Sequence, residues 1–292
     1  MKDSTSYIIV TPVRDEEAHI GKTLETVAGQ TIPPREWVIV DDGSNDQTGD
    51  IIDRFATRRP WIQTGHCPDR GFRKAGGGVI AAFSEGLRRI TCQEWEYIVK
   101  LDGDLSLEPD YFERCLERFS RDPRLGIGGG KVYSVANGDL FDDSPGDPPF
   151  HVRGATKIYR RACWQQIQPL VPAPGWDTID EVKANMLGWT TQTFGDIHLI
   201  QLKATGGADG NWRNWFKNGR ANYITGYHPF FMFLKCLKRS VRKPPVLGAV
   251  ALWAGFCSGY LRRVPQVPDP EVIRFLRQQQ LRRLALRPSI YG

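Results

Sequence analysis

Short apolar runs that alternate with helical patterns constrain this 292-residue chain more than any other feature. Residues 7–10, 36–40 and 97–101 are rich in β-branched and aromatic side chains and end at turn residues, which is typical of buried strands. Residues 20–29 and 46–55 place apolar side chains at helical spacing. Alternating strands and helices of this length predict an α/β fold, a mostly parallel sheet with helices on both faces.

Acidic side chains follow two of these strands directly, at Asp42 and at the Asp102-Gly103-Asp104 turn. Because ligands bind beyond the carboxyl ends of the strands in such sheets, we expect the three aspartates to share one crevice. Carboxylate oxygens on a tight turn suit Mg²⁺ or Mn²⁺, and glycine admits backbone conformations closed to other residues. Taken alone, the motif also fits a solvated Asp-Gly turn.

The same turn matches part of a calcium-binding EF-hand loop. The sixth position of such a loop requires glycine for a sharp turn, and here it is Leu107, followed closely by Pro109. The preceding segment is strand-like and not helical. These departures argue against a calcium loop, although its first, third, fifth, ninth and twelfth positions hold Asp102, Asp104, Ser106, Asp110 and Glu113.

Three motifs in order carry a resemblance to a known family. Pro12 to Glu16 fits the pattern Pro-x-x-(Asn/Asp)-Glu, residues 41–44 read Asp-Asp-Gly-Ser, and residues 102–104 read Asp-Gly-Asp. Over roughly residues 6 to 200 the chain resembles family 2 glycosyltransferases. The resemblance implies a GT-A fold, Rossmann-like, and an inverting, metal-dependent transfer of a sugar from a nucleotide-diphosphate donor.

The resemblance implies that Pro12, Glu16 and Asp42 hold the base and ribose of the donor. A carboxylate that accepts a base N–H or a ribose hydroxyl is chemically sensible there. In isolation, Asp42 also fits a helix cap or a turn. By the same resemblance, Asp102 contacts the donor, and Asp104 and Asp102 hold the metal.

Further cations and one histidine match the family less closely. Arg73 and Lys74 lie in the region that reaches the donor phosphates, and a cation cluster before a Gly-rich helix start suits a diphosphate. Arg220 resembles a cation that contacts the diphosphate. His198 lies where relatives place a histidine near the metal, although a lone histidine is more often structural. A solvated loop is the alternative for Arg73 and Lys74.

An inverting transfer needs a base that removes the proton of the acceptor hydroxyl. The family supplies it from a Glu-Asp motif before a helix that ends in Gly-Trp. Counting back from Gly188 puts the Asp on Asp177, but Trp176 replaces the Glu. Asp180 and Glu181 are the alternatives one helical turn further on, and any of the three also fits a helix cap.

The charge of the chain is unevenly distributed. From Arg213 onward there are 15 Lys and Arg against two acids, a net charge of +13, which leaves −7 for the preceding residues. A basic tail predicts an anionic partner, either a membrane or a nucleic acid. We place a domain boundary near residue 205, with a GT-A domain over 1–205 and a basic helical appendage over 206–292.

Apolar stretches in this tail favour a membrane surface over nucleic acid, for which no binding signature is present. Residues 246–261 are uncharged and flanked by basic pairs, and residues 229–234 form a second apolar run beside basic residues. Because a full span needs about 20 residues, these runs fit interfacial helices better. Basic flanks suit the anionic cytoplasmic leaflet. An ordinary buried helix is the alternative.

The six cysteines are scattered without a disulfide or zinc spacing, which favours a reducing compartment. The start of the chain reaches a polar turn too early for a signal peptide, so we expect no export. Residues 134–150 are rich in Gly, Pro, Asn and Asp and predict a loop. The expected location is the cytoplasmic face of the inner membrane, with peripheral or shallow insertion.

Together these patterns predict a metal-dependent transferase that moves a sugar to a lipid-linked saccharide acceptor in cell-surface or exopolysaccharide biosynthesis. One alternative is a nucleotidyltransferase, which shares the sheet and a metal-binding Asp but usually needs a Gly-rich loop that residues 11–17 lack. The other is a catalytically silent, membrane-bound scaffold.

Overall fold

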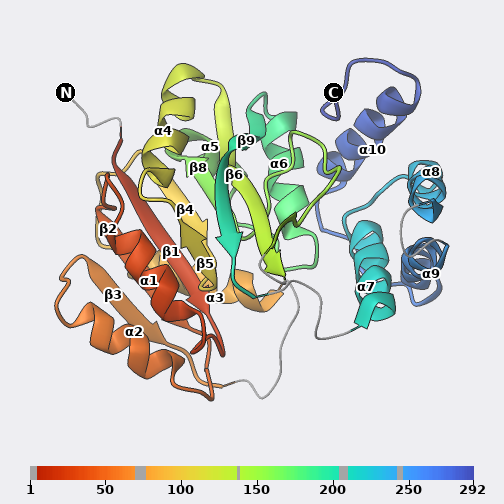
Figure 1. Cartoon of the computed structure of the whole chain (residues 1–292). Helices are drawn as coiled ribbons and strands as arrows, with labels where there is room; N and C mark the ends of the chain where they lie inside the picture. Colours follow the sequence, from red (N-terminus) through yellow and green to blue (C-terminus); the bar gives the residue numbers. More distant parts are fainter. Residues whose placement is uncertain (1–4, 70–76, 137–138, 204–209, 242–245) are drawn as a thin grey trace.

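Helices cover both faces of one mixed sheet, and four further helices follow it (Figure 1). The computed structural model describes residues 5–69, 77–136, 139–203, 210–241 and 246–292. The strands are β1 (Tyr7–Val13), β2 (Glu36–Asp41), β3 (Ile62–His66), β4 (Tyr97–Leu101), β5 (Leu105–Leu107), β6 (Leu125–Ala136), β7 (Asp139–Asp142), β8 (Thr156–Arg160) and β9 (Thr190–Gln201). The helices are α1 (Ile20–Ala28), α2 (Thr48–Ala56), α3 (Gly77–Arg89), α4 (Tyr111–Arg121), α5 (Arg161–Ile167), α6 (Trp176–Met186), α7 (Gly210–Ile224), α8 (Pro229–Ser240), α9 (Leu247–Leu261) and α10 (Pro270–Leu284).

The sheet has the strand order β3-β2-β1-β4-β8-β6-β9-β5, with β7 paired to β6. The first four strands in this order are parallel, β8 is antiparallel to β4 and β6, and β9 runs parallel to β6. Because β1, β2 and β4 are parallel, their carboxyl ends lie at one edge of the sheet. The turns after these strands are therefore neighbours in space.

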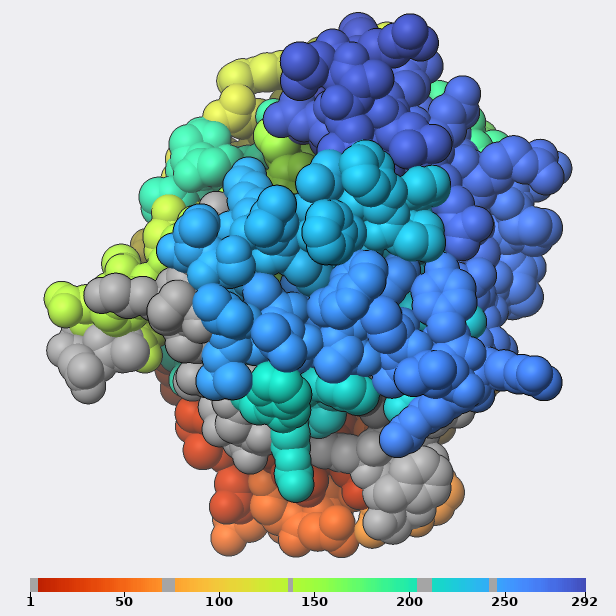
Figure 2. All heavy atoms as spheres, turned by 90° about the vertical axis from the view of Figure 1, so that its right-hand side faces the viewer, coloured from red at the N-terminus to blue at the C-terminus, as the bar shows by residue number. Residues whose placement is uncertain are grey.

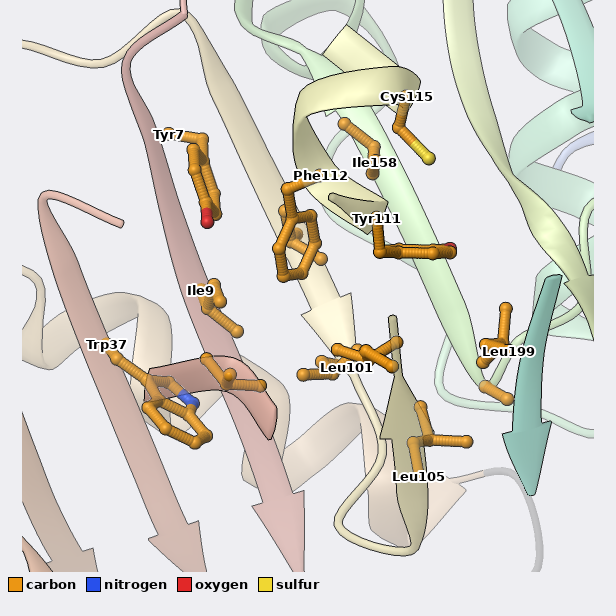
Figure 3. Close-up of a cluster of buried hydrophobic side chains, with 14 of the residues drawn as sticks. Tyr7, Ile9, Trp37, Leu101, Leu105, Tyr111, Phe112, Cys115, Ile158 and Leu199 are labelled. Carbon is orange, nitrogen blue, oxygen red and sulfur yellow. The ribbon is translucent and has the colours of Figure 1, made fainter. Parts of the chain in front are cut away.

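Alternate side chains of the central strands feed two separate apolar cores. Tyr7 and Ile9 point into the core covered by α1 and α4, whereas Ile8 and Val10 point into the core covered by α3 and α5. Figure 3 shows Tyr7 and Ile9 packed near Phe112 in the first core. Strands buried on both faces explain why β1, β2 and β4 read as nearly continuous apolar runs.

The expected strands and helices of the first half are present. The loop predicted over residues 134–150 is only partly correct. Strand β6 runs to Ala136 and pairs with the exposed strand β7, so part of the predicted loop is a two-stranded ladder. The physical reason is that backbone pairing to β6 forms this strand, while its own side chains bury little. Asn137-Gly138 between the two strands is a hairpin signal in the sequence.

Helices α7 to α10 pack around a third apolar core that also includes Ile179 and Val182 of α6. They cover one side of the molecule, coloured from teal to blue in Figure 2. The two apolar runs of the tail form α8 and α9, and α9 has 15 residues. Within the described ranges, no helix is both long enough and apolar enough to cross a membrane.

Candidate active site

The carboxyl ends of β1 and β2 bring Pro12 and Asp42 to the same edge of the sheet. Pro12 is opposite Val40 in the parallel ladder, and the Asp42 amide donates to the Val13 carbonyl at 2.8 Å. The Arg14 guanidinium donates to the Asp42 carbonyl at 2.8 Å. Both Pro12 and Asp42 are buried. Two of the three residues expected to hold the base and ribose therefore lie next to each other on neighbouring strands.

The turn after β4, residues Asp102 to Asp104, is called the aspartate turn below. Helix α1 holds it through Thr23, a fully buried side chain. The Thr23 hydroxyl lies 2.9 Å from the Gly103 carbonyl oxygen and 2.8 Å from that of Leu105, and it accepts from the Leu105 amide at 2.9 Å. These neutral hydrogen bonds fix the backbone of the turn.

Gly103 is required in the aspartate turn for space, which corrects the expectation that it serves an unusual backbone conformation. Its φ is not positive. A Cβ at this position would lie 2.6 Å from Cγ1 of Val13 and 3.2 Å from Cδ1 of Ile20. The glycine thus lets the turn approach the end of β1, where Asp42 is also held.

The aspartate turn concentrates negative charge in a poorly solvated place. Burial raises the pKa of Asp102 to about 6, while the Lys100 ammonium acts to lower it and the charge of Asp104 to raise it. Asp104 is 5% exposed. Burial raises its pKa, the Gln201 amide opposes that shift, and the nearby Glu16 charge adds to it. A cation near both carboxylates would offset their mutual repulsion and the cost of burying their charges.

Glu16 lies close to this turn, just after β1. Its amide donates to Thr48 Oγ1 at 2.8 Å, and its Oε1 is 2.8 Å from Nζ of Lys203. The other carboxylate oxygen, Oε2, is buried and accepts no hydrogen bond from the residues that the structure describes. Lys203 follows β9, so the segment after β9 reaches the residues expected to bind the nucleotide. The buried oxygen of Glu16 has unused capacity to accept a hydrogen bond.

Strand β9 brings Gln201, and not His198, to the aspartate turn. The Leu202 amide donates to the Asp104 carbonyl at 2.7 Å, and Nε2 of Gln201 donates to Oδ2 of Asp104 at 3.1 Å. His198 lies three residues earlier, about 10 Å along an extended strand, and on the opposite face because side chains alternate. Its Nε2 is 2.8 Å from the Gly195 carbonyl oxygen. The expected metal role of His198 does not fit this register.

Helix α6 places Asp177 near the same turn. The helix begins after Gly175, whose φ of +84° favours glycine, and Asp177 is in its first turn. Oδ2 of Asp177 would be 3.3 Å from a Cβ built on Gly154, so the carboxylate lies against that backbone. The Gly154 carbonyl accepts from Nζ of Lys100 at 2.5 Å, and the same ammonium pairs with Asp102. Asp177 is therefore linked to the aspartate turn through Gly154, which it contacts, and Lys100, which binds both the Gly154 carbonyl and Asp102.

Asp180 and Glu181, called the buried acid pair below, are enclosed in a network of cations and donors. Asp180 lies 2.8 Å and 3.0 Å from Nζ of Lys157 and accepts from the Tyr159 hydroxyl at 2.7 Å. Glu181 is 2.7 Å from the same ammonium and 2.9 Å from Nδ1 of His151. Asp180 is 3% exposed and Glu181 is fully buried. Protein donors thus enclose the Asp180 carboxylate, which argues against the predicted role of Asp180 as a base.

The remaining expected donor contacts are Arg73, Lys74 and Arg220. Arg73 and Lys74 lie outside the described residues. Arg220 is in the last part of α7, and within the described part of the chain it forms no ion pair or hydrogen bond. The structure thus assembles Pro12, Glu16, Asp42 and the aspartate turn at one edge, with Asp177 beside them.

Sequence reasoning missed four side chains of this region. Lys100 and Lys157 lie in the apolar strands β4 and β8 and are almost completely buried. Lysine is rarely buried without a partner, so a lysine inside an apolar strand is a signal for a buried acid nearby. Gln201 and Lys203 gave no such signal, because their neighbours come from the pairing of β9 with β5.

A hard divalent cation fits the oxygen donors of the aspartate turn. The two carboxylates are one residue apart, and carboxylate oxygens are the ligands that such a cation takes in proteins. In the part of the chain that the structure describes, no group of three or more His, Cys, Asp and Glu side chains is arranged for a metal. The fit therefore rests on Asp102 and Asp104.

Known proteins resemble this chain over the region that carries the cluster. The sequence model of "Glycosyl transferase family 2" matches residues 8–171. Chondroitin synthase of Pasteurella multocida (strain Pm70) is 30% identical over 107 residues, which are 37% of this chain and 10% of that protein. Poly-beta-1,6-N-acetyl-D-glucosamine synthase of Staphylococcus epidermidis is 30% identical over 112 residues, 38% of this chain and 25% of that protein. The match thus covers a quarter or less of these relatives.

A solved structure is similar over nearly the whole chain. The mannosyltransferase PcManGT from Pyrobaculum calidifontis, in complex with GDP-Man and Mn²⁺, gives a TM-score of 0.56 at 20% sequence identity. The alignment covers 99% of this chain and 78% of that one. At this identity the likeness is one of fold, and it confirms the expected GT-A fold class.

Proposed function

Because this chain belongs to glycosyl transferase family 2, we propose that it transfers a sugar from a nucleotide-diphosphate donor to a saccharide hydroxyl with inversion, assisted by a divalent metal ion. The observation that carries the proposal is the meeting of Asp42, Glu16 and the aspartate turn at one edge of the sheet, with Asp177 beside them. Polysaccharide synthases among the relatives support a role in polysaccharide biosynthesis.

The donor nucleotide would bind at the ends of β1 and β2. The Val13 carbonyl and Arg14 hold the backbone of Asp42 at the ends of these strands, where its carboxylate would accept a base N–H or a ribose hydroxyl. Glu16 offers its buried Oε2 in the same role. Lys203, 2.8 Å from Glu16, supplies a positive charge close to the site expected for the diphosphate.

The metal would be Mg²⁺ or Mn²⁺, held by Asp102 and Asp104. When bound, such an ion supplies Lewis-acid stabilisation of the charge on the departing nucleoside diphosphate. Lys100 pairs with the Asp102 carboxylate, and Thr23 fixes the backbone of the turn. These two residues keep the carboxylates together, although their negative charges repel each other.

Asp177 would be the base. In the proposed step, the acceptor oxygen forms a bond to the anomeric carbon, the bond from that carbon to the diphosphate oxygen breaks, and the hydroxyl proton moves to Asp177. Support comes from its half-buried place against Gly154, and within the described residues its carboxylate accepts no hydrogen bond. Lys157 donates to the Asp177 carbonyl oxygen and so fixes the first turn of α6.

We further propose that the appendage, residues 206–292, lies on an anionic membrane surface and presents a lipid-linked acceptor to the GT-A part, residues 1–205. Exposed apolar side chains recur on one face of α8 at the helical spacing of an interfacial helix. Helices α8 and α9 lie side by side on the face shown in Figure 2. The α8 stripe consists of Phe230, Phe233, Leu237 and Val241, which are 54%, 50%, 58% and 82% exposed.

Basic side chains beside this stripe support an anionic surface. Lys238, an exposed side chain, is in the last turn of α8, and the tail as a whole carries the excess positive charge described above. Each Lys or Arg near an anionic leaflet contributes about 1 kcal/mol of attraction. The proposed location is therefore the cytoplasmic face of the inner membrane, with peripheral or shallow insertion.

The transferase proposal is tested with a panel of UDP, GDP and dTDP sugars. Incubation with Mn²⁺ is expected to release nucleoside diphosphate, and EDTA is expected to stop the release. Asp104→Ala is expected to abolish metal-dependent donor binding while its circular dichroism spectrum stays that of the wild type. Absence of metal-dependent binding and hydrolysis across the panel would refute the proposal, and release of pyrophosphate from nucleoside triphosphates would indicate nucleotidyl transfer.

The membrane proposal is tested by co-sedimentation with vesicles that contain phosphatidylglycerol. The double variant Phe233→Ser and Leu237→Ser is expected to bind about tenfold more weakly or worse, because two half-exposed apolar side chains no longer enter the interface. Leu286→Ser is the matched control, since Leu286 is 92% exposed and outside the stripe. Equal binding of all three proteins would exclude the α8 stripe as the membrane contact.

A further inference from the structure

Lys235 of α8 is a cation that the described part of the chain leaves without an ion pair or hydrogen bond. Its side chain is exposed, and its Nζ lies 5.0 Å from the centre of the Tyr227 ring. Burial among protein atoms lowers the pKa of this ammonium, and the charge of Asp147 opposes that shift. An ammonium that is partly desolvated and still accessible lies in a recess, where an anionic ligand would replace the hydration it has lost.

Lys235 and Lys238 lie on one flank of α8, beside the apolar stripe described above. At 3.6 residues per turn, they lie roughly 90–160° around the helix from the middle of the stripe. Positions three apart are neighbours on a helix surface, so the two ammonium groups can reach one ligand. An anionic group bound at this flank would thus lie at the edge of the proposed membrane contact.

Phe231, on the same flank, shows that it faces the GT-A part. The ring of Phe231 lies 5.3 Å from that of Tyr291, which in turn lies 5.1 Å from the ring of Phe150. Phe150 belongs to the loop before β8, and Tyr291 follows α10. These three aromatic side chains therefore hold the flank close to the loop that also carries Asp147.

Tyr227 connects this flank with the proposed base, Asp177. Tyr227 is 8% exposed and lies between α7 and α8. Burial raises the pKa of its hydroxyl, and the charges of Asp147 and Asp177 are among those that add to the shift. At the same junction, a Cβ on Gly175 would lie 2.4 Å from Cγ2 of Thr225, so the glycine lets the end of α7 approach the start of α6. The flank and the proposed base therefore border one region.

We propose that Lys235 and Lys238 bind the phosphate group of the lipid-linked acceptor, with the lipid along the α8 stripe and the saccharide directed toward Asp177. The proposal rests on the membrane-bound acceptor proposed above, and it adds which chemical group of that acceptor the chain recognises. A phosphate suits the site because two ammonium groups can donate to its oxygens. Lipid phosphates also lie at the membrane surface, level with the flank of an interfacial helix.

Asp147 is the acid whose charge acts on Lys235, and it has a second cation beside it. Its Oδ2 lies 3.9 Å from Nε2 of His151. Burial by itself lowers the pKa of His151, but the Glu181 carboxylate and smaller acidic contributions raise it to about 9, so the imidazole is charged at neutral pH. The charge of Asp147 is therefore offset by His151, which leaves Lys235 for an external anion.

The experiment follows the lysine signals of the full chain by NMR after reductive methylation with ¹³C-formaldehyde, which keeps the positive charge. Farnesyl diphosphate is the probe, in EDTA and without nucleotide or vesicles, so that the proposed metal-dependent donor site stays empty. The signals of Lys235 and Lys238, each assigned by its absence from the corresponding Gln variant, are expected to shift on titration.

Calorimetric titration gives the affinity for the same probe. The double variant Lys235→Gln and Lys238→Gln is expected to bind about tenfold more weakly or worse, because the phosphate loses two charged donors. Lys22→Gln, which changes an exposed lysine of α1, is the control and is expected to bind as the wild type does. Equal affinity of the double variant and the wild type would overturn the proposal.

Farnesol and inorganic diphosphate separate the two parts of the ligand. Both are expected to bind more weakly than farnesyl diphosphate, since the first lacks the phosphate and the second lacks the lipid. Equal shifts with farnesol would overturn the phosphate contact, and equal affinity for inorganic diphosphate would overturn the assignment to a lipid-linked group. Shifts with phosphatidylglycerol vesicles but none with farnesyl diphosphate would also overturn the proposal, because both lysines would then contact the bilayer surface.

Because metal and nucleotide are absent, the result is independent of the transferase proposal. A missing Lys235 shift together with normal release of nucleoside diphosphate would overturn the phosphate site and leave the transferase standing. Selective binding of farnesyl diphosphate by a chain that releases no nucleoside diphosphate would support the site and refute the transferase.

Discussion

The aspartate turn and the buried acid pair contain the same kinds of side chain in different surroundings. Lys100 and Gln201 contact the turn, and burial raises the pKa of both of its carboxylates. Around the buried acid pair, Lys157, Tyr159 and His151 supply cations and donors. The two groups lie close together, since Nζ of Lys100 and Nζ of Lys157 are each 5.4 Å from the Trp176 ring.

The difference teaches which acids hold the fold and which are ready for a ligand. Two carboxylates that face a lysine and a protonated histidine form a neutral group, and removal of one partner leaves an unpaired buried charge. The aspartate turn faces one lysine and a neutral amide, with Arg153 acting on Asp102 more weakly than Lys100, and a divalent cation can neutralise the remaining negative charge. We therefore expect the buried acid pair to contribute to stability, while the aspartate turn is the proposed binding site.

The largest expected effect is on the rate of sugar transfer, and it concerns Asp177, which lies in the same helix as the buried acid pair. Asp177→Asn is expected to lower the rate of sugar transfer by about 10²–10⁴-fold, because an amide cannot accept the acceptor proton. Metal-dependent donor binding should stay unchanged, and transfer kinetics with parallel donor titration measure both. Asp196→Asn, a change at an acid that is 57% exposed, serves as control. A wild-type transfer rate in Asp177→Asn would move the base elsewhere.

The next effect is on stability. Lys157→Met is expected to lower the free energy of unfolding by about 3–5 kcal/mol, because it leaves Asp180 and Glu181 buried without their cation. Urea unfolding measures it. The control is Arg88→Gln, whose guanidinium is 70% exposed and pairs with Glu85, and which should change stability by less than about 1 kcal/mol. Equal effects of the two variants would contradict the structural assignment of the pair.

The pH dependence of the unfolding free energy tests the second cation of the buried acid pair, His151. Burial by itself lowers the pKa of His151, but the Glu181 carboxylate, with smaller contributions from Asp177 and Asp147, raises it to about 9. Because the pKa is raised above its ordinary 6.5, the stabilisation is complete below pH 6.5 and is lost as the pH rises through 9.

Between pH 6.5 and 9.5 the wild type should therefore lose roughly 2 kcal/mol more unfolding free energy than His151→Gln. Urea unfolding at both pH values measures the difference. His198→Gln is the control, because His198 is exposed and its Nε2 contacts a backbone carbonyl. The same pH dependence in the wild type and His151→Gln would show that the Glu181 contact does not charge this histidine.

The smallest expected effect concerns the neutral hydrogen bonds of the aspartate turn. Thr23→Val should lower the unfolding free energy by about 1–2 kcal/mol, since the amide of Leu105 loses its partner in a buried place. Mn²⁺ affinity should fall with it, and Thr23→Ser should restore both. Thr57→Val is the control for stability, since the exposed Thr57 hydroxyl donates to the Asp53 carbonyl. Unchanged Mn²⁺ binding in Thr23→Val would show that the turn needs no support from α1.

Much of the sheet and its acidic edge could be predicted because the signals are local. The runs that form β1, β2 and β4 are buried on both faces, so nearly every side chain in them is apolar. An acid directly after such a strand has its place set by the end of the strand. Pro12, Asp42 and the aspartate turn were therefore predictable as neighbours from the parallel order alone.

Only the tertiary structure decided between the remaining candidates, because each depends on a partner distant in sequence. The pairing of β9 with β5 determines that Gln201 meets Asp104 and that His198 faces away. A shift of one residue in that register would exchange the faces. In α6, Lys157 of β8 pairs with Asp180, whereas the Asp177 carboxylate lies against Gly154. Residue type and spacing determined where the acids occur along the chain, and packing across the sheet decided which of them are enclosed and which can bind.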